Sequence, residues 1–201
     1  MRLIITRHGE TEENKKKLFQ GQTGPGKLSA IGIEQAQKLS QRLQEEKIDV
    51  IYSSDLERAA DTAKEIAKYH PHTPLVFVKE LRERNVGEWE GKPHAEATWD
   101  KPREAHNITQ VLTKQGESLV ELQNRARKCI DMLIHNHRNK TVVLVAHNGI
   151  NTALMSVIMQ QPPEAMPEFK RQRNTAVTIV EIDEDKNHRI LLSNCTDHLT
   201  K

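Results

Sequence analysis

Two histidines stand immediately after apolar runs that are typical of buried strands. The first run, residues 1–6, leads into Arg7 and His8, and the second run, residues 141–146, leads into His147. In open α/β sheets, ligands bind in the crevice outside the carboxyl ends of the strands. We therefore expect both histidines to lie at one edge of a sheet, where an adjacent arginine suits an anion better than a hydrophobic core.

A second arginine is expected at the same edge. Arg58 falls in the first turn of a helix that follows the short strand 49–52. Residues 54–57, Ser-Asp-Leu-Glu, fit a capping box for this helix, and Asn148 could cap the helix after His147 in a similar way. Helix N-termini present unpaired N–H groups and a dipole that favours anions. Two arginines, two histidines and two helix N-termini together describe a cradle for a phosphate group.

Carboxylates for proton transfer follow the third expected strand. Residues 80–84, Glu-Leu-Arg-Glu-Arg, come shortly after the strand 75–78 and would bring acid/base groups to the same edge. Arg84, and with it Arg82 or Lys92, could meet a second anionic group of a substrate. A surface role explains these three cations equally well.

Strand-like and helix-like segments alternate along the chain, which predicts a three-layer α/β domain with a mostly parallel central sheet. Helices are expected from a Ser29 cap to residue 43, from the 54–57 box to residue 67, from a Ser118–Glu121 capping box to residue 135, and over 150–159. Two further strands are expected at 176–180 and 190–192. Residues 12–27 are typical of a long loop, and the segment 92–116 is polar and interrupted by proline; we expect it to form a short helical cap over the site.

The composition favours one domain spanning residues 1–201 without a membrane segment. No run approaches the roughly 20 apolar residues that a membrane span needs, and no secretory signal is visible. Two cysteines, Cys129 and Cys195, are too few for a disulfide framework, which predicts a cytoplasmic location. A net charge of +2 and an aromatic content of 3% give no case for nucleic acid as a partner.

Two other motifs fit their usual sites poorly. Residues 21–27 match the first seven positions of a P-loop, but Leu28 stands where Ser or Thr must bind Mg²⁺, and no buried strand comes before the motif. The histidine pairs at positions 70 and 72 and at positions 135 and 137 lack partners with metal-ligand spacing. We therefore expect neither a nucleotide P-loop nor a metal site.

With these motifs in order, the chain resembles the histidine phosphatase superfamily, in its phosphoglycerate-mutase-like branch. The resemblance runs nearly end to end and covers several short motifs. They are Arg7-His8-Gly9-Glu10-Thr11 with Asn14, Leu18-Phe19-Gln20-Gly21, Leu28-Ser29, Tyr52-Ser53-Ser54-Asp55-Leu56 with Arg58, Leu81-Arg82-Glu83-Arg84 with Gly87, Trp89 and Gly91, Gly116-Glu117-Ser118, Val145-Ala146-His147-Asn148-Gly149 and Asn174-Thr175-Ala176.

The resemblance implies a role for each matching position. His8 would be the nucleophile that takes up the phosphoryl group, and Glu83 would be the proton donor. The groups expected to bind the phosphate are Arg7, Arg58 and His147. The further substrate contacts expected are Asn14, Gln20, Gly21, Arg84 and Asn148. Glu80, Glu88 and Glu90 are expected to be solvated or structural.

The expected activity is metal-independent hydrolysis of a small-molecule phosphate monoester through a phosphohistidine. Attack on phosphorus needs a neutral imidazole, which histidine readily provides near pH 7. A mutase must shield its phosphoenzyme from water, and the short segment between Glu83 and His147 favours a phosphatase over the alternative, a phosphoglycerate mutase. A catalytically inactive binding module is a further alternative, although such members usually lack one of these residues. No cofactor is expected, the ester is not identified, and homodimer formation is left open.

Overall fold

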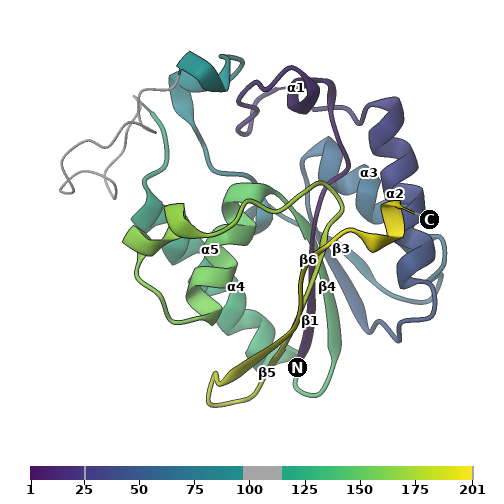
Figure 1. The fold of residues 1–201 in the computed structure, drawn as a ribbon. Helices are drawn as coiled ribbons and strands as arrows, with labels where there is room; N and C mark the ends of the chain where they lie inside the picture. Colours follow the sequence, from purple (N-terminus) through teal and green to yellow (C-terminus); the bar gives the residue numbers. More distant parts are fainter. Residues whose placement is uncertain (25, 97–114, 201) are drawn as a thin grey trace.

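The computed structural model describes residues 1–24, 26–96 and 115–200, and a six-stranded sheet runs through this part of the chain (Figure 1). The strands are β1 (Arg2–Arg7), β2 (Val50–Ser54), β3 (Leu75–Val78), β4 (Thr141–Ala146), β5 (Val177–Ile182) and β6 (His188–Cys195). Their order is β3-β2-β4-β1-β5-β6. Strands β1 to β4 pair in parallel, and β5 pairs antiparallel with both β1 and β6. The predicted mostly parallel sheet is confirmed.

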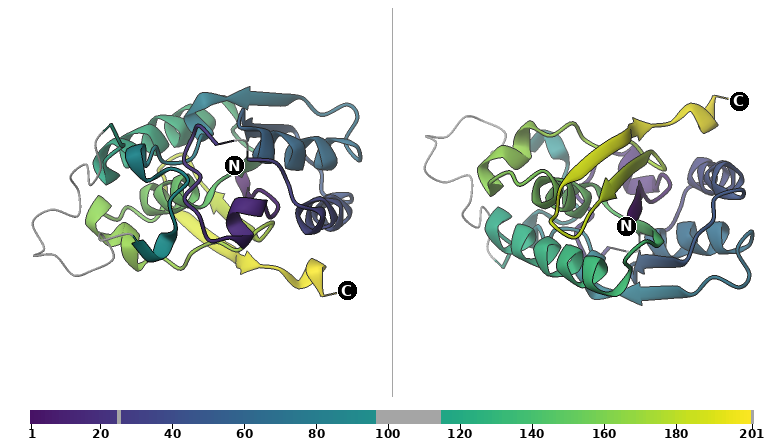
Figure 2. Two further views of the ribbon diagram at one scale, coloured as in Figure 1. Left: turned by 90° about the horizontal axis from the view of Figure 1, so that it is seen from above. Right: turned by 90° about the horizontal axis from the view of Figure 1, so that it is seen from below.

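Helices cover both faces of this sheet (Figure 2). The α-helices in the described chain are α1 (Glu12–Lys15), α2 (Ala30–Leu43), α3 (Glu57–Ala67), α4 (Leu119–Asn136) and α5 (Asn148–Ile158). One face packs against α2 and α3, and the other packs against α4 and α5. This is the three-layer arrangement that the alternation of segments predicts.

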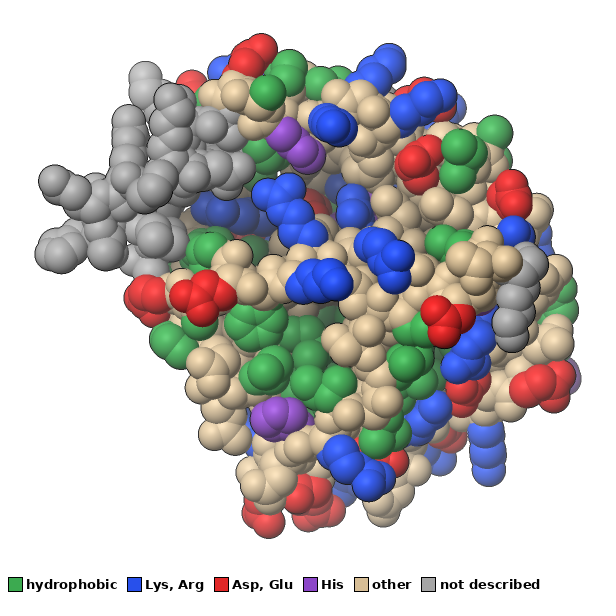
Figure 3. Space-filling model, in the orientation of Figure 1, with side chains coloured by type: hydrophobic (Ala, Val, Ile, Leu, Met, Phe, Trp, Pro, Cys, Tyr) green, Lys and Arg blue, Asp and Glu red, His purple; other side chains and the backbone are tan. Residues whose placement is uncertain are grey.

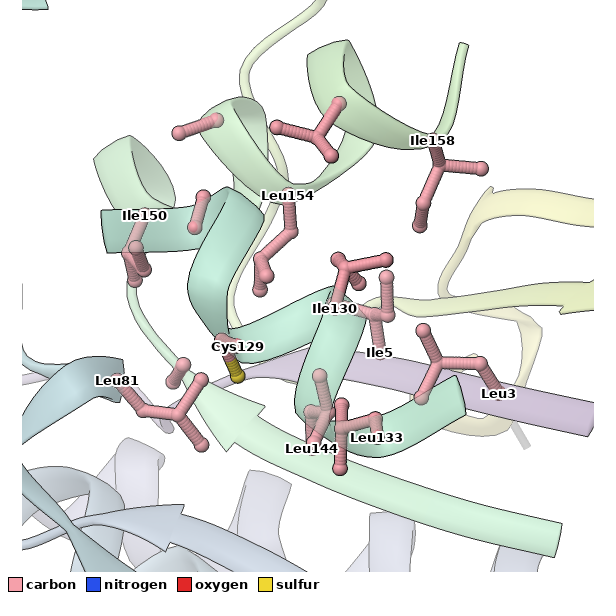
Figure 4. Packing of buried hydrophobic residues seen from close by; sticks show 14 of the residues in the cluster. Leu3, Ile5, Leu81, Cys129, Ile130, Leu133, Leu144, Ile150, Leu154 and Ile158 are labelled. Carbon is pink, nitrogen blue, oxygen red and sulfur yellow. The ribbon is translucent and has the colours of Figure 1, made fainter. Parts of the chain in front are cut away.

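Strand alternation divides the buried side chains between two cores. Leu3 and Ile5 of β1 face α4 and α5, whereas Ile4 faces α2 and α3. Figure 4 shows the first core, in which Leu144 of β4 lies beneath the apolar side of α4. Burying one Leu or Ile side chain contributes about 1.5–3 kcal/mol, so these strands are held firmly and their carboxyl ends are fixed in space.

The crevice between β1 and β4 is the place where the chain leaves the sheet in opposite directions. After β1 the chain continues to α2 on one face, and after β4 it continues directly into α5 on the other face. The two strands pair in register, with Arg7 opposite Ala146. The next residues, His8 and His147, are therefore brought together at the carboxyl edge, which points upward in Figure 1. Ligands bind at such points in open α/β sheets.

Two of the four predicted helix caps are correct. The Ser29 side chain accepts a hydrogen bond from the Gly32 N–H at the start of α2. Ser118 and Glu121 form the predicted capping box of α4. Both serines stand directly before the helices they cap, so a local sequence pattern is enough to identify them.

The predicted capping box at residues 54–57 is wrong. The N-cap of α3 is Leu56, and no side chain caps the helix. The Asp55 carboxylate instead accepts two hydrogen bonds from the guanidinium of Arg82. The Ser54 hydroxyl, which would be the cap, accepts from the Leu56 N–H, and the helix begins two residues later than the pattern predicts.

The predicted cap by Asn148 is also wrong. Helix α5 begins at Asn148 itself, and its N-cap is His147. The Asn148 Oδ1 atom accepts a hydrogen bond from the N–H of Gln172. Asn148 thus joins α5 to the segment before β5 instead of closing the helix.

The described parts of the two long connections, residues 12–27 and 92–116, contain more structure than a plain loop. Within 12–27, residues Glu12–Lys15 form the short helix α1, which begins with a capping box of Thr11 and Asn14. Residues His94–Glu96 form one 3-10 turn. Residues 97–114 lie outside the described residues, so the predicted helical cap over 92–116 remains a prediction, as does the single domain over 1–201. No helix in the described ranges is long and apolar enough to cross a membrane.

Candidate active site

His8 and His147 lie side by side at the end of β1 and β4, with ring centroids 5.1 Å apart. The backbone ladder continues to this point, because the His8 N–H donates to the Ala146 carbonyl. Both side chains are buried, with 2% of His8 and 0% of His147 exposed. The predicted convergence of two strand-end histidines is therefore present in the fold.

The hydrogen bonds of the two imidazoles assign their tautomers. The Nδ1 atom of His8 lies 2.7 Å from the Gly9 carbonyl oxygen, which can only accept. Nδ1 must therefore carry the proton, and in the neutral ring Nε2 keeps a free lone pair. The Nδ1 atom of His147 accepts a hydrogen bond from Nε of Arg58 at 3.1 Å. In neutral His147, the proton is then on Nε2, which has no hydrogen-bond partner among the described residues.

Both arginines lie beside these rings, Arg58 buried and Arg7 partly buried. Arg58 is 1% exposed, and its Nη2 donates to the Gly21 carbonyl at 2.8 Å. Arg7 donates from Nη1 to the Gln172 carbonyl, while its buried Nε has no hydrogen-bond partner in the described chain. A buried donor without a partner costs about 1–3 kcal/mol. Unpaired donors on Arg7 and His147 are the arrangement expected for binding an anion.

Burial and the clustered positive charge keep both histidines neutral. Burial, followed by the charges of Arg58 and Arg7, lowers the pKa of His8 well below its usual value. Burial, followed by the charge of Arg58, has the same effect on the pKa of His147. Burial also lowers the pKa of Arg7 to about 10, which leaves its guanidinium charged near neutral pH. The site therefore combines neutral imidazoles with a fixed positive charge.

The Glu83 carboxylate lies at the N-terminus of α5. Its Oε2 accepts from the Gly149 N–H at 3.1 Å, and its Oε1 accepts from the Ile150 N–H at 3.2 Å and from the Arg84 N–H at 2.8 Å. Because α5 begins directly after His147, Glu83 is held at the same edge as the two histidines. Three backbone donors fix the position of this acid.

Asn14 and Asn174 join the loop after β1 to the segment before β5. The Asn14 Oδ1 atom accepts from the Thr11 N–H and from Nδ2 of Asn174, which also donates to the His8 carbonyl. This use of Oδ1 leaves the Nδ2 group of Asn14 as a donor. In the next loop, the Gly21 carbonyl accepts a hydrogen bond from Arg58. The Oε1 atom of Gln20 is buried and has no hydrogen-bond partner in the described chain.

A family model described as "Histidine phosphatase superfamily (branch 1)" matches residues 3–196. The chain belongs to this superfamily. It is 33% identical over 205 residues to "Phosphoserine phosphatase 1" of Hydrogenobacter thermophilus, covering 99% of this chain and 94% of the relative.

Two solved structures of the superfamily share the fold. The first is a mutant phosphoserine phosphatase from Entamoeba histolytica in complex with phosphoserine, with a TM-score of 0.86 at 27% identity, covering 98% of both chains. The second is a mycobacterial glucosyl-3-phosphoglycerate phosphatase in complex with VO3, with a TM-score of 0.85 at 28% identity, covering 97% of this chain and 99% of the other.

The three cations considered for a second anionic group behave differently. Arg82 is bound to Asp55, and Lys92 lies with its Nζ 5.0 Å above the Trp89 ring. The Arg84 side chain is anchored by one hydrogen bond, from Nε to the Glu117 carbonyl, and its two terminal nitrogens make no hydrogen bond within the described chain. In Figure 3, Lys and Arg side chains gather around a hollow in the upper half of the molecule. Arg84 is thus the best placed of the three for a second anionic group.

Some residues that shape the histidine phosphatase site were not expected from the sequence. Thr62 accepts a hydrogen bond from the Gly9 N–H and so fixes the turn after His8. Gln172 donates from Nε2 to the carbonyls of Ile5 and Ala176. Glu90 binds two backbone N–H groups of the loop around Gly21. These contacts join residues far apart in the chain, and only Glu90, within a turn-rich stretch after Glu83, gave a local signal.

The alternative sites have no support in the described chain. No group of three or more His, Cys, Asp or Glu side chains that could hold a metal ion occurs in residues 1–24, 26–96 and 115–200. His137 is engaged with Tyr52, whose hydroxyl lies 3.0 Å from its Nε2. The stretch resembling a P-loop is preceded by irregular chain and an isolated bridge instead of a strand, as the sequence indicates.

Proposed function

We propose that this protein is a phosphatase that hydrolyses a small phosphate monoester through a phosphohistidine on His8. The observation that carries the proposal is the pair of opposite tautomers at the β1–β4 crevice. His8 is oriented with a free Nε2 lone pair, and the ring of His147, whose centroid lies 5.1 Å from that of His8, has an unpaired Nε2 donor. A nucleophile beside preorganised donors is the arrangement that phosphoryl transfer requires.

In the first step, Nε2 of His8 attacks phosphorus while the bond from phosphorus to the ester oxygen breaks. Arg7, Arg58 and His147 bind the phosphoryl oxygens and stabilise the charge that spreads over them in the transition state. Glu83 gives its proton to the departing oxygen, so that an alcohol leaves instead of an alkoxide. Asn14, Gln20 and Gly21 complete the rim of the phosphate site.

In the second step, water attacks the phosphorus of phospho-His8. Glu83, now a carboxylate, accepts a proton from that water, and the bond to His8 Nε2 breaks to release inorganic phosphate. The imidazole returns to its starting tautomer, since Gly9 holds the Nδ1 proton throughout. Fixed arginine charges neutralise the phosphate in this scheme, so no step calls for a metal ion or another cofactor.

A mutase and an inactive binding module remain the alternatives. The relatives reported above are named phosphatases, which supports hydrolysis over isomerisation. All five expected catalytic residues, His8, Glu83, Arg7, Arg58 and His147, are present, which argues against an inactive module. A mutase would have to hold phospho-His8 away from water until its substrate reorients.

We also propose that the substrate carries a second anionic group near Arg84. Arg84 follows Glu83 directly in the sequence. Desolvation by burial lowers the pKa of its guanidinium. A free arginine fork suits a carboxylate or a second phosphate. Two of the related proteins are named for phosphoserine and for glucosyl-3-phosphoglycerate, both of which contain a carboxylate. Cytoplasmic location remains a prediction from the two free cysteines.

The test is phosphate release from a panel of metabolite phosphates in the presence of a chelator, with isomerisation of 3-phosphoglycerate measured alongside. We expect release that survives chelation and is abolished in His8→Ala. Arg84→Ala should raise KM for phosphoserine or phosphoglycerates more than for para-nitrophenyl phosphate, which lacks a second anionic group. Isomerisation with little release would replace the phosphatase by a mutase, and an inactive wild type that binds a protein would favour the binding module.

A further inference from the structure

The carboxylate of Glu90 binds the backbone of the loop that surrounds Arg58. Its Oε1 atom accepts from the Gln22 N–H at 2.7 Å, and its Oε2 atom accepts from the Thr23 N–H at 2.9 Å. The Thr23 hydroxyl also donates to Oε2. Both oxygens of one carboxylate thus bind two successive backbone N–H groups, an arrangement that fixes the direction of the chain at this point.

The loop that Glu90 holds is the one that positions Arg58. Gly21 adopts a φ of +51°, and its carbonyl accepts from Arg58 Nη2 at 2.8 Å. A Cβ atom at Gly21 would lie 2.0 Å from the Glu90 carboxylate, so the loop and the carboxylate approach each other as closely as a glycine allows. The other end of the same guanidinium donates from Nε to His147.

The segment carrying Glu90 is itself fastened to the start of this loop. Gly91 donates to the Phe19 carbonyl, and Phe19 donates to the Lys92 carbonyl. The Gln22 side chain adds a bond to the other side of the site, from Nε2 to the Glu83 carbonyl at 2.7 Å. Segments 19–23 and 83–92 therefore form one unit around the phosphate-binding side chains.

We infer that Glu90 is a positioning residue for phosphate binding, which acts through the loop 21–23 to set the guanidinium of Arg58. The inference rests on the proposed function, since it assumes that Arg58 binds the phosphate. It differs from the expectation that Glu90 is only solvated or structural. The negative charge of Glu90 also lies close enough to Arg58 to raise its pKa, against the larger effect of burial.

Glu90→Gln is the direct test, because an amide has one acceptor where the carboxylate has two. The new NH₂ group would face a backbone N–H, so the loop and Arg58 should shift. We expect KM for para-nitrophenyl phosphate and Ki for inorganic phosphate to rise together, each by about tenfold or more, as is typical for a lost charged hydrogen bond. Inorganic phosphate has no other part to bind, so its Ki reports the phosphate contacts directly.

Matched variants separate positioning from stability. Glu88→Gln removes the charge of an exposed neighbour in the same turn and should leave KM and Ki unchanged. Glu90→Asp keeps a carboxylate and should recover part of the affinity, and it carries the test alone if Glu90→Gln does not fold. Thr23→Ala removes only the hydroxyl bond and should give a smaller rise than Glu90→Gln.

The inference is overturned if Glu90→Gln lowers Tm or the active fraction while KM and Ki keep their wild-type values, because that is what a merely structural residue would do. A wild type without any turnover contradicts the proposed function instead. In that case calorimetric titration with inorganic phosphate still decides the inference, since wild type and Glu90→Gln should differ in affinity by the same factor.

Discussion

Gly149 is the residue on which the position of the proposed acid depends. Its N–H donates to Glu83 Oε2, and a Cβ atom at this position would lie 2.5 Å from Glu83 Oε1. Even the smallest side chain would therefore displace the carboxylate from the start of α5. A glycine in a helix is usually a weakness, but here it leaves room for the carboxylate of the proposed acid.

Gly149→Ala should impair protonation of the leaving group more than phosphate binding. We expect kcat/KM for an alkyl phosphate, which reports only the step that releases the alcohol, to fall by about 10²-fold, the lower end of what a general acid contributes. The fall for para-nitrophenyl phosphate should be clearly smaller, because nitrophenolate leaves without a proton. Steady-state kinetics with the two esters measure the difference, with Thr152→Ala in the next turn as the control. An equal fall with both esters would contradict the role of Glu83 as the acid.

At the scale of elements, the start of α2 packs directly on the turn that follows His8. A Cβ atom at Gly32 would lie 1.9 Å from the Glu10 carbonyl oxygen, and a Cβ atom at Gly9 would lie 2.4 Å from the Gly32 carbonyl oxygen. Both contacts are with backbone, which cannot rotate away. Ser29 strengthens the junction, because its N–H donates to the Glu10 carbonyl and its hydroxyl donates to the Glu10 carboxylate.

Gly32→Ala should therefore separate α2 from the loop that carries the nucleophile. We expect a loss of about 2–3 kcal/mol in the free energy of unfolding, as for other overpacked sites, together with weaker inhibition by inorganic phosphate. Urea denaturation and the phosphate Ki measure the two effects. Gly24→Ala is the matched control, because its nearest contact would be 3.6 Å away, and it should change stability by less than about 1 kcal/mol. Equal effects of the two variants would show that the close approach is unimportant.

The elements also show where sequence reasoning succeeds and where it stops. Strand-end histidines could be predicted because a run of buried residues has a local signature and its end defines an edge of the sheet. The start of α3 could not be predicted in the same way, because Asp55, between the predicted cap Ser54 and the helix, is bound by Arg82, 27 positions further along the chain. The hydrogen bond from Gln22 to Glu90 joins residues that are 68 positions apart. Contacts of this kind depend on how the loops meet above the sheet, which no local pattern records.

For the whole molecule, the buried site makes folding sensitive to acid. In the folded protein, burial and the charges of Arg7 and Arg58 lower the pKa of His8 well below 6.5, and the pKa of His147 is lowered in the same way. An unfolded chain binds protons at these histidines near pH 6.5, whereas the folded chain does not. Because the unfolded state then holds more protons, stability rises with pH and is lost as the pH falls from about 6.5 toward the folded-state values.

This linkage predicts a measurable slope of the free energy of unfolding against pH. Between about pH 6 and pH 5, each of the two histidines should reduce the free energy of unfolding by up to about 1.4 kcal/mol per pH unit. Urea denaturation across this range gives the slope for the wild type. Replacing the nucleophile, in His8→Asn, should remove close to half of the contribution of the pair, whereas His72→Asn, at an exposed position, should leave the slope unchanged. The same burial that keeps a lone pair of His8 free for attack thus makes the folded protein less stable in acid. If His8→Asn leaves the slope unaltered, the ring is not held neutral.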